Sequence, residues 1–283
     1  MENDNNILSN SYHNLMKIAD EKKIEYLNAS PFPNIVLDNF FSNNFLEELL
    51  NNFPNLEKVN SSEEYTNKNE VKFANNDYEN FHNSIKILID FMNSENFLNF
   101  LQKITSIKEK LISDPELNGG GLHEIKSGGM LKIHTDFRKH PSLDLDRRIN
   151  VLIYLNKNWS EKYGGELELW DKNMKYCGKK IKPIFNKMVI FSTTDFSNHG
   201  HPDPLNCPNE RSRKSIALYY FSSGRPEHEI INKHKKNRTY FKNREGVKND
   251  VYEKNENFKD FLRSFKFYKY MKNFEKKYLR KKK

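Results

Sequence analysis

Between Gly119 and Phe221 the chain is a succession of short apolar segments separated by turn residues, and this pattern limits the fold more than any other feature. Several short strands at this spacing indicate a β-sandwich or a barrel. No helical segment alternates with them, so a parallel sheet is not expected. The predicted strands are 122–125, 131–137, 148–155, 166–170, 180–185, 187–192 and 214–221.

The region before Gly119 is dominated by helical patterns. A strand is predicted at 34–40, a loop at 57–75, and helices at 42–50, 78–92 and 96–112, where apolar residues recur at helical spacing. Helices followed by strands indicate an α+β fold with the helices on one face of a β-sandwich. We therefore divide the chain into a support region at 1–118, a β core at 119–226 and a tail at 227–283.

The positive charge of the chain is concentrated in this tail. Residues 231–283 contain 19 Lys and Arg against 6 Asp and Glu, whereas residues 1–230 contain 28 against 32. A nucleic-acid-binding core is therefore not expected. In the tail, 231–256 is predicted to be irregular and 257–280 to be a basic amphipathic helix. We expect this helix to dock its aromatic face on the domain, and a contact with an acidic partner is the alternative.

The apolar segments are too short to cross a membrane, so a membrane partner is not expected. The N-terminus has neither the basic nor the apolar part of a secretory signal. Cys177 and Cys207 are the only cysteines, which is too few for a disulfide framework. We therefore expect a cytoplasmic location.

The predicted strand at 131–137 contains His134 and Asp136. Side chains two residues apart on a strand point to the same face. An imidazole and a carboxylate in this arrangement supply two of the three ligands in the 2-His-1-carboxylate set, which holds non-haem Fe(II) and leaves coordination positions open.

A third ligand has to come from a strand that faces the first. His199 follows the predicted strand at 187–192 and is the best candidate. His201 lies two residues further along and competes with it. His123 and His140 are more remote alternatives.

A metal with three protein ligands needs a co-substrate at its open positions. If that molecule is 2-oxoglutarate, its far carboxylate requires a buried cation and hydroxyl donors. Arg213 is our candidate for the cation, because a guanidinium grips a carboxylate with two charge-assisted hydrogen bonds. Ser215 shares its strand face and Tyr154 offers a phenol, whereas the alternatives are Arg211 and Lys214, the latter on the opposite face.

Two sets of motifs carry a resemblance to a known family. Tyr-Leu-Asn-Lys-Asn-Trp at 154–159 and Gly-Gly-Glu-Leu at 164–167 look like the corresponding stretch of the hypoxia-sensing prolyl hydroxylases. The segments 197–202 and 212–220 look like a bacterial subgroup of the same superfamily. Residues 120–221 thus resemble the prolyl-4-hydroxylase-type branch of the Fe(II)/2-oxoglutarate-dependent dioxygenases.

The resemblance implies a double-stranded β-helix, or jelly roll, as the core. It implies that His134, Asp136 and His199 bind iron, that Arg213 binds the 2-oxoglutarate carboxylate and that Tyr154 assists it. The cofactors implied are Fe(II), 2-oxoglutarate and O₂, with ascorbate as a further expectation.

The implied activity is hydroxylation of an unactivated C–H bond by a 2-oxoglutarate-dependent dioxygenase. A prolyl or other side chain of a protein is the first expected substrate, a small molecule or glycan precursor the second, and a methylated nucleic acid the third. The rival class is a cupin-like binding module without oxygenase activity. Two departures from the animal enzymes bear on the substrate: 125–132 lacks aromatic residues, and 138–146 is an insertion.

Overall fold

The computed structural model describes residues 4–231, 236–248 and 250–251. All described residues belong to one compact unit, Met1–Val251. The amphipathic helix predicted at 257–280 lies outside the described residues. The predicted boundaries after residues 118 and 226 stay predictions.

The helices lie in the N-terminal part of the chain. The described residues form the α-helices α1 (Asp4–Ile7), α2 (Leu15–Leu27), α3 (Asn43–Asn51), α4 (Asn83–Asn93) and α5 (Glu95–Thr105). The helix predicted at 96–112 ends earlier than expected because Ser106 adopts a left-handed conformation with a φ of 56°. Within the described part of the chain, no helix is both long and apolar enough to span a bilayer.

The strands include several that the sequence pattern did not predict. They are β1 (Asn34–Asp38), β2 (Glu63–Thr66), β3 (Glu70–Asn75), β4 (Ile112–Ser113), β5 (Gly121–Lys126), β6 (Met130–Thr135), β7 (Asp146–Tyr154), β8 (Leu167–Trp170), β9 (Cys177–Ile181), β10 (Lys187–Ser192), β11 (Asn198–His201), β12 (Ser212–Ser222) and β13 (Tyr240–Phe241). The loop predicted at 57–75 is wrong, because β2 and β3 form a hairpin there. Only Val71 and Phe73 of β3 alternate as apolar side chains with polar ones, and this pattern is too short to predict a strand.

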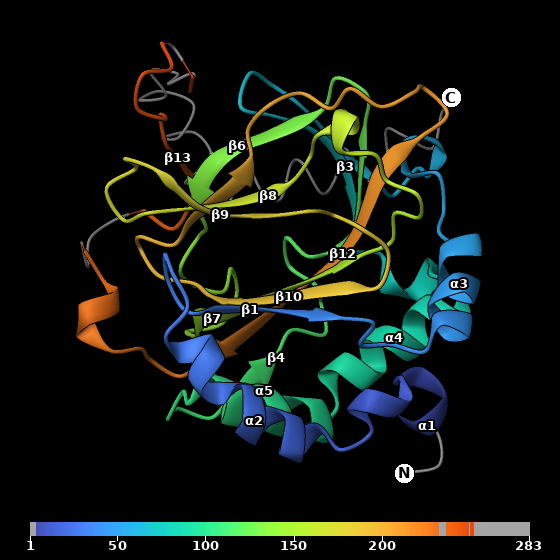
Figure 1. The fold of residues 1–283 in the computed structure, drawn as a ribbon, viewed down its shortest axis with the longest axis vertical. Coiled ribbons are helices and arrows are strands. Elements are labelled where there is room, and N and C mark those ends of the chain that lie inside the picture. The colour runs from blue at the N-terminus through green and yellow to red at the C-terminus, as the bar shows by residue number, and fades with distance from the viewer. Residues whose placement is uncertain (1–3, 232–235, 249, 252–283) are drawn as a thin grey trace. The chain divides into compact units, whose positions relative to one another are not determined.

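The thirteen strands of the described residues belong to one antiparallel sheet, whose main path is β1-β10-β7-β12-β5-β3-β6-β11-β8-β9. The sheet curls so that the layer of β1, β10 and β7 lies opposite the layer of β6, β8 and β9 (Figure 1). A curled antiparallel sheet of this kind fits the predicted jelly roll.

The strand β7 shows how the two faces of a layer are used. Ile149, Val151 and Ile153 belong to the core cluster that includes the buried faces of the helices, and α2, α4 and α5 lie on this side of the layer (Figure 1). Leu152 and Tyr154 belong instead to the apolar cluster between the two layers. Alternation along the strand therefore separates a helix-covered outer face from an inner face that looks into the jelly roll.

Candidate active site

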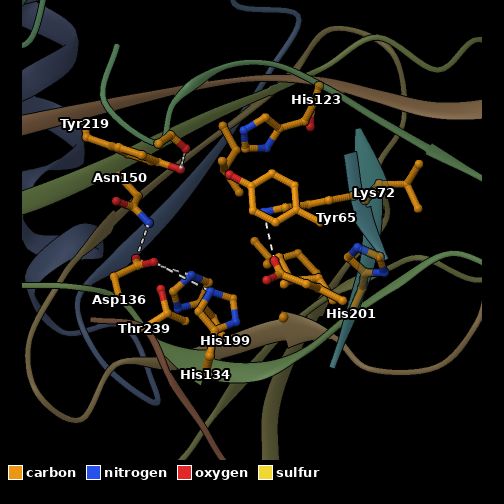
Figure 2. A pocket seen from close by; sticks show the side chains of 18 of the residues that line it. Tyr65, Lys72, His123, His134, Asp136, Asn150, His199, His201, Tyr219 and Thr239 are labelled. Carbon is orange, nitrogen blue, oxygen red and sulfur yellow. Dashed lines mark hydrogen bonds and ion pairs between the residues drawn. The ribbon is translucent and has the colours of Figure 1, made fainter. Parts of the chain in front are cut away.

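Three of the residues predicted as metal ligands meet in the structure. His134 on β6 and His199 on β11 are direct partners in the strand register, and their ring centroids are 4.5 Å apart. Asp136 follows the end of β6, with carboxylate oxygens 3.6 Å from His134 Nε2 and 3.5 Å from His199 Nε2 (Figure 2). One ligand atom from each lies within 4.8 Å of the other two, as a shared metal ion requires.

The imidazole rings are oriented by hydrogen bonds to the backbone. Nδ1 of His134 lies 2.8 Å from the carbonyl of Lys132, and Nδ1 of His199 lies 3.0 Å from the carbonyl of Ser197. A carbonyl only accepts, so each Nδ1 donates its hydrogen and each Nε2 keeps a lone pair directed at the cluster. Burial lowers the pKa of His199 to about 4, although Asp136 acts in the opposite direction. His199 is therefore neutral at pH 7, the form that binds metals.

The structure also separates His199 from its competitors. The strand register shifts between His199 and His201, and His201 is not part of the metal-binding cluster. At Gly200, which lies between them, a Cβ atom would come within 2.7 Å of the carbonyl oxygen of Leu131. The glycine thus allows β11 to lie close enough to β6 for His199 to face His134. His140 lies elsewhere, 3.5 Å from Asp114.

The carboxylate of Asp136 is held by two side chains that the sequence analysis did not single out. Asn150 donates a hydrogen bond of 2.8 Å to Oδ2, and the guanidinium of Arg147 lies 3.1 Å from the same oxygen. Arg147 is itself placed between the rings of Phe137 and Tyr219, at 4.6 and 3.3 Å from their centroids. Burial alone raises the pKa of Asp136, but Arg147 and then His199 hold it well below its usual range. The group is an anion at pH 7.

Arg213 on β12 is a buried cation without a carboxylate partner among the described residues. Its Nε donates 2.8 Å to the carbonyl of Gly165, and one terminal nitrogen donates 3.2 Å to the Tyr154 hydroxyl. Gly165 has a φ of +76°, and a Cβ there would lie 3.0 Å from the Arg213 side chain. This explains the glycine in the Gly-Gly-Glu-Leu motif.

The two alternative cations point elsewhere. Lys214 pairs with Glu124 at 3.1 Å, and Arg211 lies over the rings of Trp159 and Tyr163. Neither lines the cavity that contains the metal cluster. Arg213 is thus the cation that the structure brings to the cluster.

A cavity of about 270 Å³ joins Arg213 to the metal cluster. Ser215 lines it, whereas Tyr154 lies behind Arg213 and is not among the lining residues. Sequence reasoning missed several lining residues. They are Tyr65, Glu70 and Lys72 of the β2–β3 hairpin, Arg147 of β7, Tyr219 of β12, and Thr239 of the chain after β12. Figure 2 shows Lys72, His123 and His201 on the side of this cavity away from the cluster.

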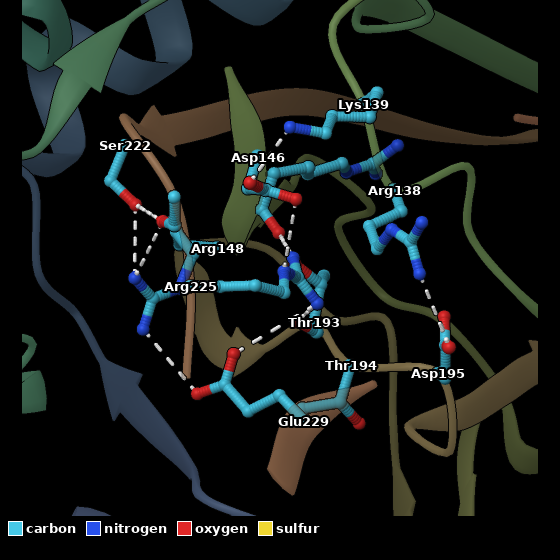
Figure 3. Close-up of polar contacts among 12 residues, drawn as sticks. Arg138, Lys139, Asp146, Arg148, Thr193, Thr194, Asp195, Ser222, Arg225 and Glu229 are labelled. Atoms are coloured by element: carbon cyan, nitrogen blue, oxygen red, sulfur yellow. Dashed lines mark hydrogen bonds and ion pairs between the residues drawn. The ribbon is translucent and has the colours of Figure 1, made fainter. Parts of the chain in front are cut away.

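The chain after β12 is fastened to β7 by a network of charged side chains (Figure 3). Arg148 donates to Ser222 Oγ at 2.9 Å and to Glu229 at 3.3 Å, and Arg225 lies 3.4 Å from Asp146. These contacts hold residues 222–229 against the layer that carries the site.

Further along, residues 236–248 and 250–251 form a segment that we call the C-terminal strap. Its strand β13 pairs with β6, with Phe241 opposite His134, and their rings are 5.7 Å apart. Arg244 binds both Asp203 and the buried Asp250, and Asp250 also binds Lys132 of β6 at 3.1 Å. The prediction that 231–256 is irregular is therefore wrong for β13, where backbone pairing with a distant strand decides the conformation.

Replacing Arg244 with Ala is expected to loosen this strap. The change removes the bonds to Asp203 and Asp250, which join the strap to the core. We expect the amide of Lys242, which donates to the carbonyl of Ile133, to exchange with deuterium about 10-fold faster, since local opening controls exchange. Amides of β10 serve as the internal reference and Lys248→Ala as the control. Unchanged exchange in the strap would show that Arg244 does not fasten it.

The groups present fit a divalent transition metal and a dicarboxylate. Two imidazoles and one ionised carboxylate make up the cluster, and this is the donor set preferred by non-haem Fe(II). In the same cavity lies a buried guanidinium with no carboxylate partner in the described part of the chain, and it fits the far carboxylate of a dicarboxylic co-substrate.

A family model described as the 2OG-Fe(II) oxygenase superfamily matches residues 120–221. Among solved structures, the chain is similar to a prolyl hydroxylase from Trichoplax adhaerens in complex with a peptide of hypoxia inducible factor, with 19% identity over 75% of this chain and 92% of that chain and a TM-score of 0.55. A prolyl-4-hydroxylase from Pseudomonas putida matches at 13% identity over 75% and 100%, with a TM-score of 0.52. Prolyl 4-hydroxylases from Phytophthora capsici match at 18% identity over 79% and 68%, with a TM-score of 0.52. At these identities the similarity concerns the fold.

Proposed function

We infer the reaction of this chain from one premise: through residues 120–221 it belongs to the 2OG-Fe(II) oxygenase superfamily and is a 2-oxoglutarate-dependent dioxygenase. We propose that it hydroxylates a side chain of a protein, with a prolyl residue as the first candidate. The observation that carries the enzymatic part is the joint presence of the His134, Asp136 and His199 cluster and of Arg213 in one cavity. A cupin-like binding module has no need of this pair of features.

In this proposal His134, Asp136 and His199 hold Fe(II). Their Nε2 and carboxylate atoms converge, because backbone carbonyls orient both imidazoles. Asn150 and Arg147 orient the carboxylate in turn.

The co-substrate lies between this cluster and Arg213. The guanidinium binds the far carboxylate of 2-oxoglutarate, Ser215 contributes from the same strand, and Tyr154 positions the guanidinium from behind. The bound iron supplies the coupling between oxidative decarboxylation of 2-oxoglutarate by O₂ and hydroxylation of an unactivated C–H bond. The protein supplies orientation and shields the site from water. A cytoplasmic location and a use of ascorbate remain part of the proposal.

The preference for a prolyl side chain is supported by the fold shared with prolyl hydroxylases. A small-molecule acceptor is the second candidate, and a specific observation favours it. The cavity is bordered by Tyr65 and Lys72 of the β2–β3 hairpin and by Thr239 of the strap. These side chains limit the room in the cavity for an acceptor beside the co-substrate.

Product analysis tests both candidates. The protein, loaded with Fe(II) under anaerobic conditions, is mixed with 2-oxoglutarate and air in the presence of either a library of proline-containing peptides or the low-molecular-weight fraction of a cell extract. We expect succinate formation to rise with the peptides, and a peptide heavier by one oxygen atom on proline. A product found only with the low-molecular-weight fraction would mean that the acceptor is a small molecule and not a prolyl side chain. Absence of succinate in both arms contradicts the proposed activity.

A further inference from the structure

His201 is a buried histidine to which none of the roles assigned above to the described residues belongs. Its side chain is 3% exposed, and both ring nitrogens are without a hydrogen-bond partner among the described residues. A buried polar group left without a partner costs about 1–3 kcal/mol, so such groups are rare in folded proteins. A bound molecule that supplies the partner is the simplest reason to keep one.

The surroundings of His201 indicate the charge of that molecule. His201 lines the same cavity as Arg213 and Lys72, and both cations lie near enough to act on its ring electrostatically. Lys72 is paired with Glu70 at 3.4 Å, so its charge is offset inside the protein. Among the described residues, no carboxylate offsets the charge of Arg213 in this way. The positive charge at this end of the cavity therefore favours a bound anion.

His123 lines the cavity as well, but its hydrogen-bonding role differs. A hydrogen bond with the backbone of Gly119 occupies one side of the ring, and only Nε2 lacks a partner. Because the Gly119 carbonyl can only accept, His123 donates through Nδ1 and its free Nε2 is an acceptor. An acceptor does not suit a carboxylate, whereas His201 keeps a ring N–H that is free to donate.

We propose that His201 donates a hydrogen bond to the far carboxylate of 2-oxoglutarate and is, with Arg213, a co-substrate-binding residue. Arg213 spends two of its donors on Gly165 and Tyr154. A carboxylate offers about four lone-pair sites, more than a single guanidinium edge fills. The proposal rests on the proposed function, because it requires 2-oxoglutarate to lie in this cavity.

Two ligands that differ only in the far carboxylate test the contact. The protein is loaded with Mn(II), which permits no turnover, and the dissociation constants of 2-oxoglutarate and of 2-oxopentanoate are measured by calorimetry. The second ligand keeps the keto acid and lacks the far carboxylate. We expect His201→Leu to raise the dissociation constant of 2-oxoglutarate about 10-fold, which is the effect of one charge-assisted hydrogen bond. The dissociation constant of 2-oxopentanoate should not change. His201→Gln, which retains an N–H donor, is expected to restore most of the affinity.

The outcomes separate this inference from the proposed function. If wild-type protein binds 2-oxoglutarate and His201→Leu binds it equally well, His201 makes no contact with the carboxylate. If the variant weakens both ligands alike, His201 acts on the shape of the cavity and the inference is overturned. If wild-type protein binds neither ligand, the proposed function itself fails.

Discussion

Replacing Asp136 with Ala is expected to lower 2-oxoglutarate turnover by at least about 100-fold and to weaken Fe(II) binding correspondingly. Loss of a group that only orients a metal ligand typically costs about 10–100-fold, and Asp136 is placed as a ligand itself. The measurements are succinate formation at saturating peptide and a metal titration of the protein. Asp144→Ala, in the loop after β6 and exposed, is the matched control and should stay within about twofold of wild type. Full turnover in Asp136→Ala would show that Asp136 is not a metal ligand.

A second consequence of the same change has to be separated from the first. Removal of Asp136 leaves the buried guanidinium of Arg147 without its anion, and breaking a buried pair in this way costs about 3–5 kcal/mol. Loss of activity could then reflect unfolding. The double variant Asp136→Ala, Arg147→Met removes the stranded charge and keeps the aliphatic packing between Phe137 and Tyr219. We expect the double variant to unfold at nearly the same urea concentration as wild type, and to remain without turnover.

Replacing Arg213 with Met is expected to weaken the binding of 2-oxoglutarate by about 100-fold or more. The variant loses at least one charge-assisted hydrogen bond of about 1.5–3 kcal/mol and also the charge itself. The metal affinity should not change, since Arg213 does not belong to the cluster. Arg211→Met, in the same basic sequence, is the control. Equal effects of the two changes on the 2-oxoglutarate dissociation constant would mean that the cation is misassigned.

The thermal stability of the Arg213→Met variant tests independently whether Arg213 binds a ligand or has a structural role. Without ligand, Arg213 is buried with no carboxylate partner among the described residues, and burial lowers its pKa. Removing such a charge relieves a desolvation cost. We therefore expect ligand-free Arg213→Met to unfold at the same temperature as wild type or above it, whereas added 2-oxoglutarate stabilises only the wild type. A variant that unfolds earlier would indicate a structural role for the guanidinium.

How much of the site the sequence predicts depends on the range of the interactions involved. His134, Asp136 and Arg213 are recognisable because strand periodicity is local, and a two-residue spacing places side chains on one face. The choice between His199 and His201 is not local. It depends on the pairing of β11 with β6 and on the register shift between these two histidines.

The residues that were missed share a physical reason. Tyr65 and Lys72 lie in a hairpin whose apolar alternation is limited to Val71 and Phe73. Pairing of β3 with β5 and β6 therefore contributes more to its strand character than apolar alternation does. Arg147 immediately precedes another arginine at the start of β7, and only burial distinguishes a ligand-orienting guanidinium from a surface charge. Apolar periodicity therefore predicted the strands of the core better than the polar lining of its cavity.

The strap has a consequence for how the protein is made. One edge of β6 is covered in two halves, by β3 at Met130 and Leu131 and by β13 at His134 and Thr135. During synthesis, the half that carries His134 stays uncovered until residues about one hundred positions later leave the ribosome. An open strand edge invites pairing with other chains. A shortened chain that ends near Pro226 would keep this edge permanently and is expected to aggregate, even though it contains every metal ligand.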